Sequence, residues 1–311
     1  MKRYDIVIVG GGMAGLSAAL YGGWLGHRVL LLEREIIGGE IINADKIENF
    51  PGFPDGIQGA DLVAQTELQA TKFGMESTYQ EVREIKVSGE NRLVQTSEEA
   101  YEAKAVVVAS GGAHRALGIK GEKEFEGNGV SHCATCDGAF FAEKPVAVIG
   151  GGDTALDEGL FLTQFASRVT IIHRRGRLRA SETLQERARG NPKIDLLLDS
   201  VLEEITGKSC VEVIRVRDLK AQSSSLVPVA GVFTCVGFEP STAFLKGLVE
   251  LDAMGHVPVN LNMQTSVPGI YAVGYARQGS VGQLASAAGD GVTAAVAAHR
   301  YISSLGSRGA L

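Results

Sequence analysis

The chain has 311 residues, of which 45% are hydrophobic and 40 are glycine, and its formal net charge at pH 7 is −6. This length favours two domains, and the acidic balance gives no indication of a nucleic-acid-binding surface. Four cysteines in so long a chain do not make the disulfide framework of a small secreted protein, and no apolar run reaches the ~18 residues that span a bilayer. Because Asp5 and the glycines from Gly10 interrupt the apolar start that a signal peptide needs, we expect a soluble cytoplasmic protein.

A nucleotide-binding pattern opens the chain. A continuous apolar run, typical of a buried parallel strand, is followed by G-x-G-x-x-G, a helical stretch, a second apolar strand and an acid. These elements are residues 6–9, 10–15, 14–26, 28–32 and Glu33. The glycines let the backbone approach a pyrophosphate at the helix N-terminus, and Glu33 can accept hydrogen bonds from ribose hydroxyls. A plain glycine-rich turn is the alternative, but a strand, a helix and an acid at this spacing favour a dinucleotide site.

The stretch up to residue 112 completes a first domain. Turn residues without periodicity predict a loop, which is followed by a helix, two alternating strands and a third buried strand. These occupy 38–54, 59–73, 82–94 and 105–109. The chain then runs into Ser110-Gly111-Gly112, a candidate exit from the domain.

Two cysteines three positions apart, Cys133 and Cys136, form the block Cys-Ala-Thr-Cys-Asp with Asp137. In a chain of βαβ units this spacing indicates a redox pair, because two close thiols can form a disulfide and one thiol pKa falls toward neutrality. The alternative is half of a zinc site, but zinc needs four ligands, and Cys210 and Cys235 stand alone in apolar surroundings. We therefore predict a redox pair and no metal.

A second copy of the nucleotide-binding pattern begins after the cysteines. Its apolar strand, 146–149, leads into Gly150, Gly152 and Ala155, with alanine in the last place of the fingerprint. A constant offset of 140 positions superimposes the two copies, so that Gly10 aligns with Gly150. This internal repeat argues against a chance resemblance of either copy.

The two copies differ in charge where the second strand ends. Glu33 aligns with His173, which is followed by Arg174 and Arg175. A carboxylate suits a free ribose 2′-hydroxyl and repels a 2′-phosphate, whereas arginines bind that phosphate through charge-assisted hydrogen bonds. The second copy is therefore predicted to bind NADP rather than NAD; the alternative is that the basic stretch, which continues to Arg179, is an exposed turn.

The remaining chain alternates short strands with turns and ends in a helix. Short β-rich runs, a turn that crosses back to the first domain, a strand and a helix are expected at 194–236, 237–240, 269–274 and 283–299. Cys210 and Cys235 lie in the β-rich runs, where we expect packed core thiols rather than reactive ones.

Together these blocks resemble low-molecular-weight thioredoxin reductase over essentially the whole chain. The stretches that carry the resemblance are GGGMAG, GGE with IENFPG, GVSHCATCDGAFF, GGGDTALDE, HRR with RLRA, TSVPGIYAVG and GQLASAAGDG. Flavoprotein relatives without a disulfide share the fingerprints but lack the CATCDG block, which makes that block highly specific.

The resemblance implies an α/β fold of two Rossmann-like, three-layer ββα nucleotide-binding domains, the NADPH domain being inserted into the FAD domain. The expected bounds are 1–113 and 242–311 for the FAD domain and 114–241 for the NADPH domain. It implies a homodimer in which NADPH reduces FAD, the flavin opens the Cys133–Cys136 disulfide, and the dithiol reduces thioredoxin or a thioredoxin-like protein. One flavin must serve both steps, so a rotation of the inserted domain is implied, with hinges near 113–115 and 240–242.

The resemblance also assigns site residues position by position. Cys136 is expected against the isoalloxazine, Cys133 exchanges with the protein substrate, and Asp137 acts as acid and base. FAD is expected at Gly10, Gly12, Ala14, Gly15, Glu33, Gly39, Glu40, Asn49, Val82, Tyr275, Gln283 and Leu284. NADPH is expected at Gly150, Gly152, Asp153, Thr154, His173, Arg174, Arg175 and Arg179.

Three positions depart from the family pattern: Glu40 stands for Gln, Tyr275 for an Asp that contacts the ribityl chain, and Gly282 for Arg. All three cluster around the expected flavin. They keep two alternatives open. One is a related flavoprotein with another electron donor, such as ferredoxin or a second flavin, or with another disulfide substrate. The other is a non-catalytic nucleotide-binding or redox-sensing protein.

Overall fold

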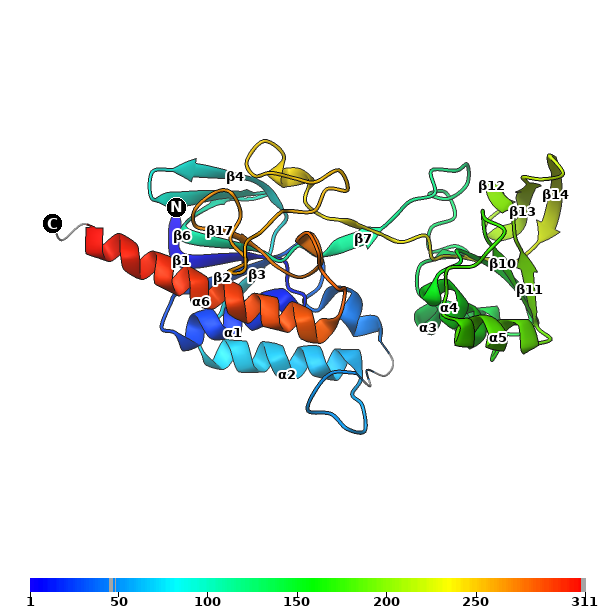
Figure 1. The fold of residues 1–311 in the computed structure, drawn as a ribbon, viewed down its shortest axis with the longest axis horizontal. Coiled ribbons are helices and arrows are strands. Elements are labelled where there is room, and N and C mark those ends of the chain that lie inside the picture. Colours follow the sequence, from blue (N-terminus) through cyan, green and yellow to red (C-terminus); the bar gives the residue numbers. More distant parts are fainter. Residues whose placement is uncertain (45–46, 48, 309–311) are drawn as a thin grey trace. The chain divides into compact units, whose positions relative to one another are not determined.

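The computed structural model divides the chain into two units, which we describe separately (Figure 1). Unit 1 comprises residues 1–113 and 239–311, and unit 2 comprises 114–238. The structure describes residues 1–44, 47 and 49–308, without the side chains of Asn43, Cys136 and 306–308. Both units are α/β, which confirms the predicted fold class.

Unit 1 is built on a seven-stranded sheet of order β3-β2-β1-β6-β5-β4, with β17 also paired to β6. Its strands are β1 (Lys2–Val9), β2 (Val29–Glu33), β3 (Glu76–Tyr79), β4 (Val82–Ser88), β5 (Asn91–Thr96), β6 (Ala100–Val108) and β17 (Ile270–Ala272). Strands β3, β2, β1, β6 and β17 are parallel to their neighbours, whereas β5 and β4 continue the sheet antiparallel. The continuous apolar runs of β1 and β2 are buried on both faces, as expected of central parallel strands.

Three helices cover one face of this sheet: α1 (Met13–Trp24), α2 (Gly59–Lys72) and α6 (Leu284–Arg308) (Figure 1). Helices α1 and α6 approach closely at Gly291, where the lack of a side chain leaves room: a Cβ there would lie 2.2 Å from the carbonyl oxygen of Ala14. The opposite face packs a second core with the segment that holds the short helix η3 (Ala243–Leu245). Two further short helices, η1 (Gly39–Asn43) and η4 (Gly274–Ala276), lie in loops of unit 1.

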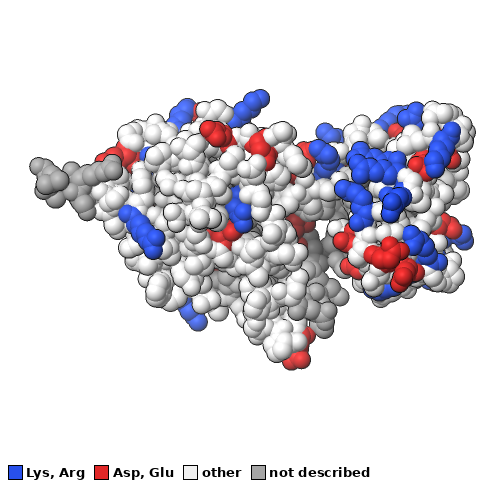
Figure 2. All heavy atoms as spheres, in the orientation of Figure 1, with Lys and Arg blue, Asp and Glu red and all other residues white. Residues whose placement is uncertain are grey.

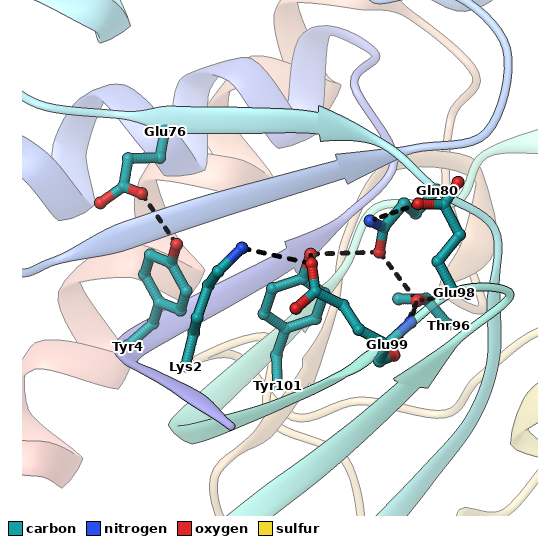
Figure 3. A network of polar contacts seen from close by, with 8 residues as sticks. All are labelled: Lys2, Tyr4, Glu76, Gln80, Thr96, Glu98, Glu99 and Tyr101. Carbon is teal, nitrogen blue, oxygen red and sulfur yellow. Dashed lines mark hydrogen bonds and ion pairs between the residues drawn. The ribbon is translucent and has the colours of Figure 1, made fainter.

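A polar network holds the amino-terminal end of β1 against its neighbours (Figure 3). The Tyr4 hydroxyl donates to Glu76 of β3 (2.8 Å). The Tyr101 hydroxyl lies within hydrogen-bonding distance of oxygens of Glu99 (2.8 Å) and Gln80 (3.1 Å) and can donate to either. Thr96 donates to the same Gln80 oxygen at 2.8 Å. Tyr4 lies near the start of β1, whereas Gln80 directly follows Tyr79, the β3 residue paired with Glu33. The network thus connects several strands of the sheet, and we assign it a structural role.

Unit 2 contains a five-stranded parallel sheet of order β11-β10-β9-β15-β8. The strands are β8 (Val130–Ser131), β9 (Pro145–Ile149), β10 (Arg168–Ile172), β11 (Ile194–Leu197) and β15 (Gly231–Thr234). The helices are α3 (Ala134–Asp137), η2 (Gly138–Phe141), α4 (Asp153–Leu162) and α5 (Glu182–Gly190). An antiparallel sheet of β12 (Ser200–Gly207), β13 (Val211–Asp218) and β14 (Ser223–Pro228) completes the unit. The order β11-β10-β9-β15 repeats the order β3-β2-β1-β6 of unit 1.

The two connecting segments pair with each other as β7 (Gly112–His114) and β16 (Phe238–Pro240). The chain leaves unit 1 after residue 113, and it returns after 238 rather than after the predicted 241. The earlier return has a local reason, because the backbone N–H of Ser241 already donates to the carbonyl of Gly111 at 3.1 Å.

Two predictions from the sequence need correction or extension. Cys210 is exposed at the β12–β13 turn and is not a core thiol, since the turn places it outside both strands; Cys235 packs against the core of unit 2 as predicted. The last helix continues beyond the predicted 299 to Arg308. Part of the predicted 38–54 loop, residues 45, 46 and 48, lies outside the described residues. Every described helix is too short or too polar to cross a bilayer.

Candidate functional site

The first glycine loop is closely packed at Gly15 and open at Gly12. Gly10 has a φ of +105°, in the left-handed region that favours glycine. A Cβ at Gly15 would lie 1.9 Å from the carbonyl oxygen of Gly10, so no larger residue fits there without movement of the backbone. At Gly12, which caps α1, a Cβ would meet nothing within 4 Å. The open side at a helix N-terminus is where a pyrophosphate can approach the backbone.

Glu33 lies beside this loop at the end of β2. One carboxylate oxygen accepts the backbone N–H of Gly11 at 2.7 Å, and the other accepts those of Arg34 (2.8 Å) and Glu35 (3.0 Å). Because an ionised carboxylate offers about four acceptor sites, the half-buried group keeps capacity for a ribose hydroxyl. The three backbone donors hold it in place before any ligand binds.

Several other predicted flavin residues of unit 1 gather near the same loop. The N–H of Gly38 donates to the carbonyl of Gly11 at 2.9 Å, which brings Gly39 and Glu40 of η1 alongside it. Asn49 donates to Gln283 at 3.1 Å, directly before Leu284 begins α6. A Cβ at Gly274 would lie 3.2 Å from the Cβ of Ala14, and Val82 begins β4 shortly after Tyr79, the β3 partner of Glu33.

A buried ion pair that the sequence did not reveal fixes the loop of Tyr275. Arg277 contacts both carboxylate oxygens of Asp290, at 2.6 and 3.1 Å, and Asp290 also accepts the N–H of Gly274 at 3.1 Å. The Tyr275 ring lies over Gly112, where a Cβ would be 2.7 Å from it, and edge-on to His256 at 5.5 Å. The departure from the family pattern thus brings a half-buried aromatic ring rather than a carboxylate to this loop.

The second glycine loop, in unit 2, is closed by the segment that follows β10. The carbonyl of Gly151 accepts the N–H groups of Arg179 (2.6 Å) and Ala180 (3.2 Å), and Asp153 accepts the N–H of Ser181 at 2.7 Å. As in unit 1, a Cβ on the cap residue Gly152 would meet nothing within 4 Å, and Thr154 in the first turn of α4 is exposed. The loop therefore keeps an open approach to the N-terminus of α4.

His173 occupies the place that Glu33 holds in unit 1. Its ring packs against the glycine loop, since a Cβ at Gly151 would lie 2.3 Å from Nδ1. Burial, helped by the nearby positive charge of Arg179, lowers the pKa of His173. The buried Nε2 atom has no hydrogen-bond partner among the described residues. His173 thus presents a neutral ring to the loop, and the positive charge comes from its neighbours.

The arginines after β10 are exposed and have no acidic partner. Among the described residues, no ion pair or side-chain hydrogen bond involves Arg174, Arg175, Arg177 or Arg179. Figure 2 shows basic side chains gathered on the displayed face of unit 2. Free guanidinium groups beside an open glycine loop suit a phosphate, which they can bind through paired, charge-assisted hydrogen bonds.

The redox block lies between β8 and η2 in unit 2. Ser131 holds Cys133 through its hydroxyl oxygen, which accepts the backbone N–H of Cys133 at 3.1 Å. Cys133 is disulfide-bonded, and its sulfur lies 3.3 Å from the hydroxyl of Thr135. The N–H of Asp137 donates to the carbonyl of Cys133 at 3.2 Å, and its carboxylate is half-buried. The predicted place of the Cys136 side chain lies outside the described residues.

A hydrogen-bonded pair of a thiol and a carboxyl, Cys235 and Glu158, contacts the redox block, and it was not predicted from the sequence. The Cys235 thiol donates to Glu158 at 3.0 Å, and Glu158 also accepts a hydrogen bond from the backbone of Ala134, the first residue of α3. Burial raises the pKa of Glu158, against the opposing effect of these bonds. Burial and the nearby carboxylate raise the pKa of Cys235, which keeps its thiol protonated. No sequence motif signals this pair, because the two residues lie 77 positions apart.

Two histidines flank the redox block on another side. His132 stacks on His114, with ring centroids 4.7 Å apart, and its Nε2 atom lies 3.1 Å from Glu126. Its Nδ1 atom is hydrogen-bonded to Thr234 at the end of β15. These contacts fix the residue directly before Cys133. No described group of three His, Cys, Asp or Glu side chains has the arrangement of a metal site.

A pocket of about 720 Å³ opens beside α3, lined among others by Thr135, Glu158 and Arg187. Within unit 2 the fold thus brings together the redox block, the pair beneath it and the second glycine loop. The predicted flavin residues all lie in unit 1.

Comparison with known proteins agrees with this arrangement. Residues 4–291 match the family model of the pyridine nucleotide-disulphide oxidoreductases. A thioredoxin reductase of Peptoclostridium litorale is 41% identical over 308 residues, covering 97% of this chain and 98% of its own. The thioredoxin reductase of Lactococcus lactis in its FR conformation has a TM-score of 0.90 at 38% identity, covering 97% of this chain and 99% of its own. That of T. acidophilum has a TM-score of 0.87 at 34% identity, covering 96% and 99%.

Proposed function

Because the chain belongs to the pyridine nucleotide-disulphide oxidoreductase family, we propose that it is a flavoprotein disulfide reductase that passes electrons from NADPH, through FAD and the Cys133–Cys136 disulfide, to thioredoxin or a thioredoxin-like protein. The net reaction oxidises one NADPH, consumes one proton and converts one protein disulfide into two thiols. The observation that carries the proposal is that unit 2 combines a disulfide-bonded Cys133 with a glycine loop flanked by unpaired arginines.

The residues of unit 1 fit an FAD. Gly12 leaves room for the pyrophosphate at the start of α1, and Glu33, held by three backbone N–H groups, keeps acceptor capacity for the ribose. Gly39, Glu40, Asn49, Gln283 and Leu284 are proposed to complete the site. When bound, FAD supplies two-electron transfer between a nicotinamide and a disulfide.

The residues of unit 2 fit NADPH and the exchange chemistry. Arg174 and Arg175 are proposed to bind the 2′-phosphate, with Arg179 nearby and Thr154 at the open helix start. The thiolate of Cys133 is the proposed attacker on the substrate disulfide, since only the thiolate is a good nucleophile. Asp137, linked to Cys133 through the backbone, is the proposed group that accepts and returns the proton.

The two sets of residues lie in different units, so we further propose that unit 2 rotates about the β7 and β16 segments to present first the nicotinamide and then the disulfide to one flavin. We infer a homodimer that acts in the cytoplasm. Thioredoxin is the proposed partner because the relatives named above are thioredoxin reductases.

An anaerobic titration tests the proposal. NADPH should bleach the flavin absorbance of the purified protein, and the reduced protein should then reduce thioredoxin. In Cys133→Ser the bleaching should persist while reduction of thioredoxin is lost. The control is Cys210→Ser, which changes an exposed cysteine of the same unit and should leave both steps intact.

A flavin that NADPH does not bleach, but that reduced ferredoxin does, would replace the proposed donor. Protein that binds no flavin at all, or a Cys133→Ser variant that still reduces thioredoxin, would overturn the function itself.

A further inference from the structure

A second, smaller pocket lies in unit 1, beneath the carboxyl-terminal half of α6. It has a volume of about 290 Å³ and is lined by Asn262, Gln264, Tyr271, Ala297, Arg300 and Tyr301. At about 1.5 Å per residue, Tyr301 lies about 25 Å along α6 from Leu284, where the flavin residues are expected. The pocket is therefore separate from the proposed redox site, and the proposed function does not use it.

A tyrosine hydroxyl without a described protein partner, on the pocket wall, points to a ligand in this pocket. Tyr271 is 1% exposed, and its hydroxyl makes no hydrogen bond with any described residue. The hydroxyl of so buried a tyrosine normally has a hydrogen-bond partner, and here Tyr271 lines the pocket, from which a partner can reach it. Burial raises the pKa of Tyr271 to about 12, so its hydroxyl keeps its proton and can donate at neutral pH.

The charge around the pocket is positive and unbalanced. Arg92 is 3% exposed, yet among the described residues its guanidinium hydrogen-bonds only to the Tyr301 hydroxyl, at 2.9 Å, and to the backbone carbonyls of Gly89, Asn91 and Pro268. A buried cation without a carboxylate is unfavourable unless another anion lies near it. Arg300, on the pocket wall, also has no partner among the described residues, and no acidic side chain lines the pocket.

The Arg92–Tyr301 pair packs against the backbone of Gly269. A Cβ at Gly269 would lie 2.8 Å from Nη2 of Arg92 and 2.8 Å from the Tyr301 ring, so the turn at this glycine leaves room for both. Because the Tyr301 oxygen accepts from Arg92, its own hydroxyl hydrogen is available to a ligand. The residues that line the pocket thus carry hydroxyl, amide and guanidinium donors, and none of them carries a carboxylate.

We propose that this pocket binds a phosphate group, either as the free ion or as part of a small phosphomonoester. Arg300 would supply the guanidinium, Tyr271 and Tyr301 the hydroxyl donors, and Asn262 and Gln264 the amide donors. The volume lies at the lower limit of about 300–1,000 Å³ for small-molecule sites, which suits a phosphate-sized group and excludes a dinucleotide.

The test uses a variant that lacks the other expected phosphate site, the one at Arg174 and Arg175. Binding of inorganic phosphate and of glycerol 3-phosphate is measured by calorimetry on the full-length protein carrying Arg174→Ala and Arg175→Ala, at constant ionic strength. One saturable site is expected for both probes, and the tighter of the two identifies the source of the phosphate. Tyr271→Phe, which removes only the hydroxyl, should weaken binding about 10- to 150-fold, as the loss of one hydrogen bond to a charged group predicts, and Arg300→Gln should also weaken it.

The matched controls are Tyr79→Phe and Arg83→Gln, two exposed positions of unit 1 outside the pocket, which should bind as the parent does. Crystals soaked in selenate provide an independent readout, with an anomalous peak expected between Arg300 and Tyr271. Absence of the peak, absence of a saturable site, or equal loss in the control variants would overturn the proposal. The proposed redox function would stand in each of these cases, because its residues lie elsewhere.

Discussion

The two glycine loops share one backbone plan and differ in what surrounds it. Each loop follows a central strand of a parallel sheet, β1 in unit 1 and β9 in unit 2. In each, a glycine that has open space around its Cα caps the following helix. At the end of the next strand, unit 1 has Glu33, and unit 2 has a neutral His173 followed by arginines that have no acidic partner among the described residues. The difference teaches that topology makes the place for a dinucleotide, and a few side chains select its charge.

The packing beneath the loops differs as well. Unit 1 needs Gly15, where a Cβ would come within 1.9 Å of a carbonyl oxygen, whereas unit 2 accommodates the methyl of Ala155. One turn further along the helix, the buried Ala18 of unit 1 aligns with Glu158, the carboxyl beneath the redox block. Unit 2 thus carries a carboxyl group beside the redox block at a position that is buried alanine in unit 1.

The charge difference gives the largest expected effect. Arg174→Ala combined with Arg175→Ala removes the two proposed charge-assisted hydrogen bonds to the 2′-phosphate of NADPH, each worth about 1.5–3 kcal/mol. The preference of kcat/KM for NADPH over NADH should fall by about two to four orders of magnitude. Arg187→Ala, an exposed and unpaired arginine of the same unit, serves as control. An unchanged preference in the double variant would show that the two loops do not differ in the way proposed.

Exchanging the glycine and the alanine tests the packing difference. Gly15→Ala forces a methyl against the Gly10 carbonyl and should reduce the free energy of unfolding by about 3 kcal/mol, the upper end for overpacking. Ala155→Gly should cost only about 1 kcal/mol, the difference in helix propensity. Denaturant unfolding of both variants gives the two values. Similar costs for the two would contradict the close approach seen only in unit 1.

Removing the acid tests the other strand end. Glu33→Ala takes away the proposed ribose acceptor and should weaken FAD binding to the apoprotein about 10- to 150-fold, corresponding to about 1.5–3 kcal/mol. Quenching of flavin fluorescence during titration measures this affinity. Glu35→Ala, an exposed neighbour paired with Arg34 at 2.9 Å, should bind FAD as the unaltered protein does. Equal affinities for the Glu33 and Glu35 variants would remove Glu33 from the site.

The smallest effect is expected at Glu158. Its folded pKa is raised above the value of 4.5 for the unfolded chain, so the protonated carboxyl stabilises the fold at low pH, and this contribution is lost as the pH rises through the raised value. Glu158→Gln should therefore flatten the decline of stability above pH 4.5, while Glu212→Gln, the same change at an exposed position of unit 2, should not. Denaturant midpoints across the pH range compare the two. A decline as steep as that of the parent in Glu158→Gln would refute the buried-carboxyl explanation.

The sequence alone determined the fold class, the family, the repeat of the glycine loops and the charge difference at their strand ends. These features depend on neighbours along the chain: apolar runs define buried strands, glycines at fixed spacing define the loops, and the residue at a strand end follows from counting. For the same reason the bounds predicted at 59–73 and 146–149 lie within one residue of those of α2 and β9, whereas for the strand at 6–9 only the end agrees, since β1 already begins at Lys2.

Only the tertiary structure decided which distant residues meet. Glu158 contacts Cys235 across 77 positions, His132 contacts Thr234 across 102, and Asn49 contacts Gln283 across 234. The exposure of Cys210 and the burial of Arg92 without a carboxylate belong to the same class. Single side chains of this kind carry no periodic signal, and their burial and charge balance arise only when strands and helices from separate parts of the chain pack together.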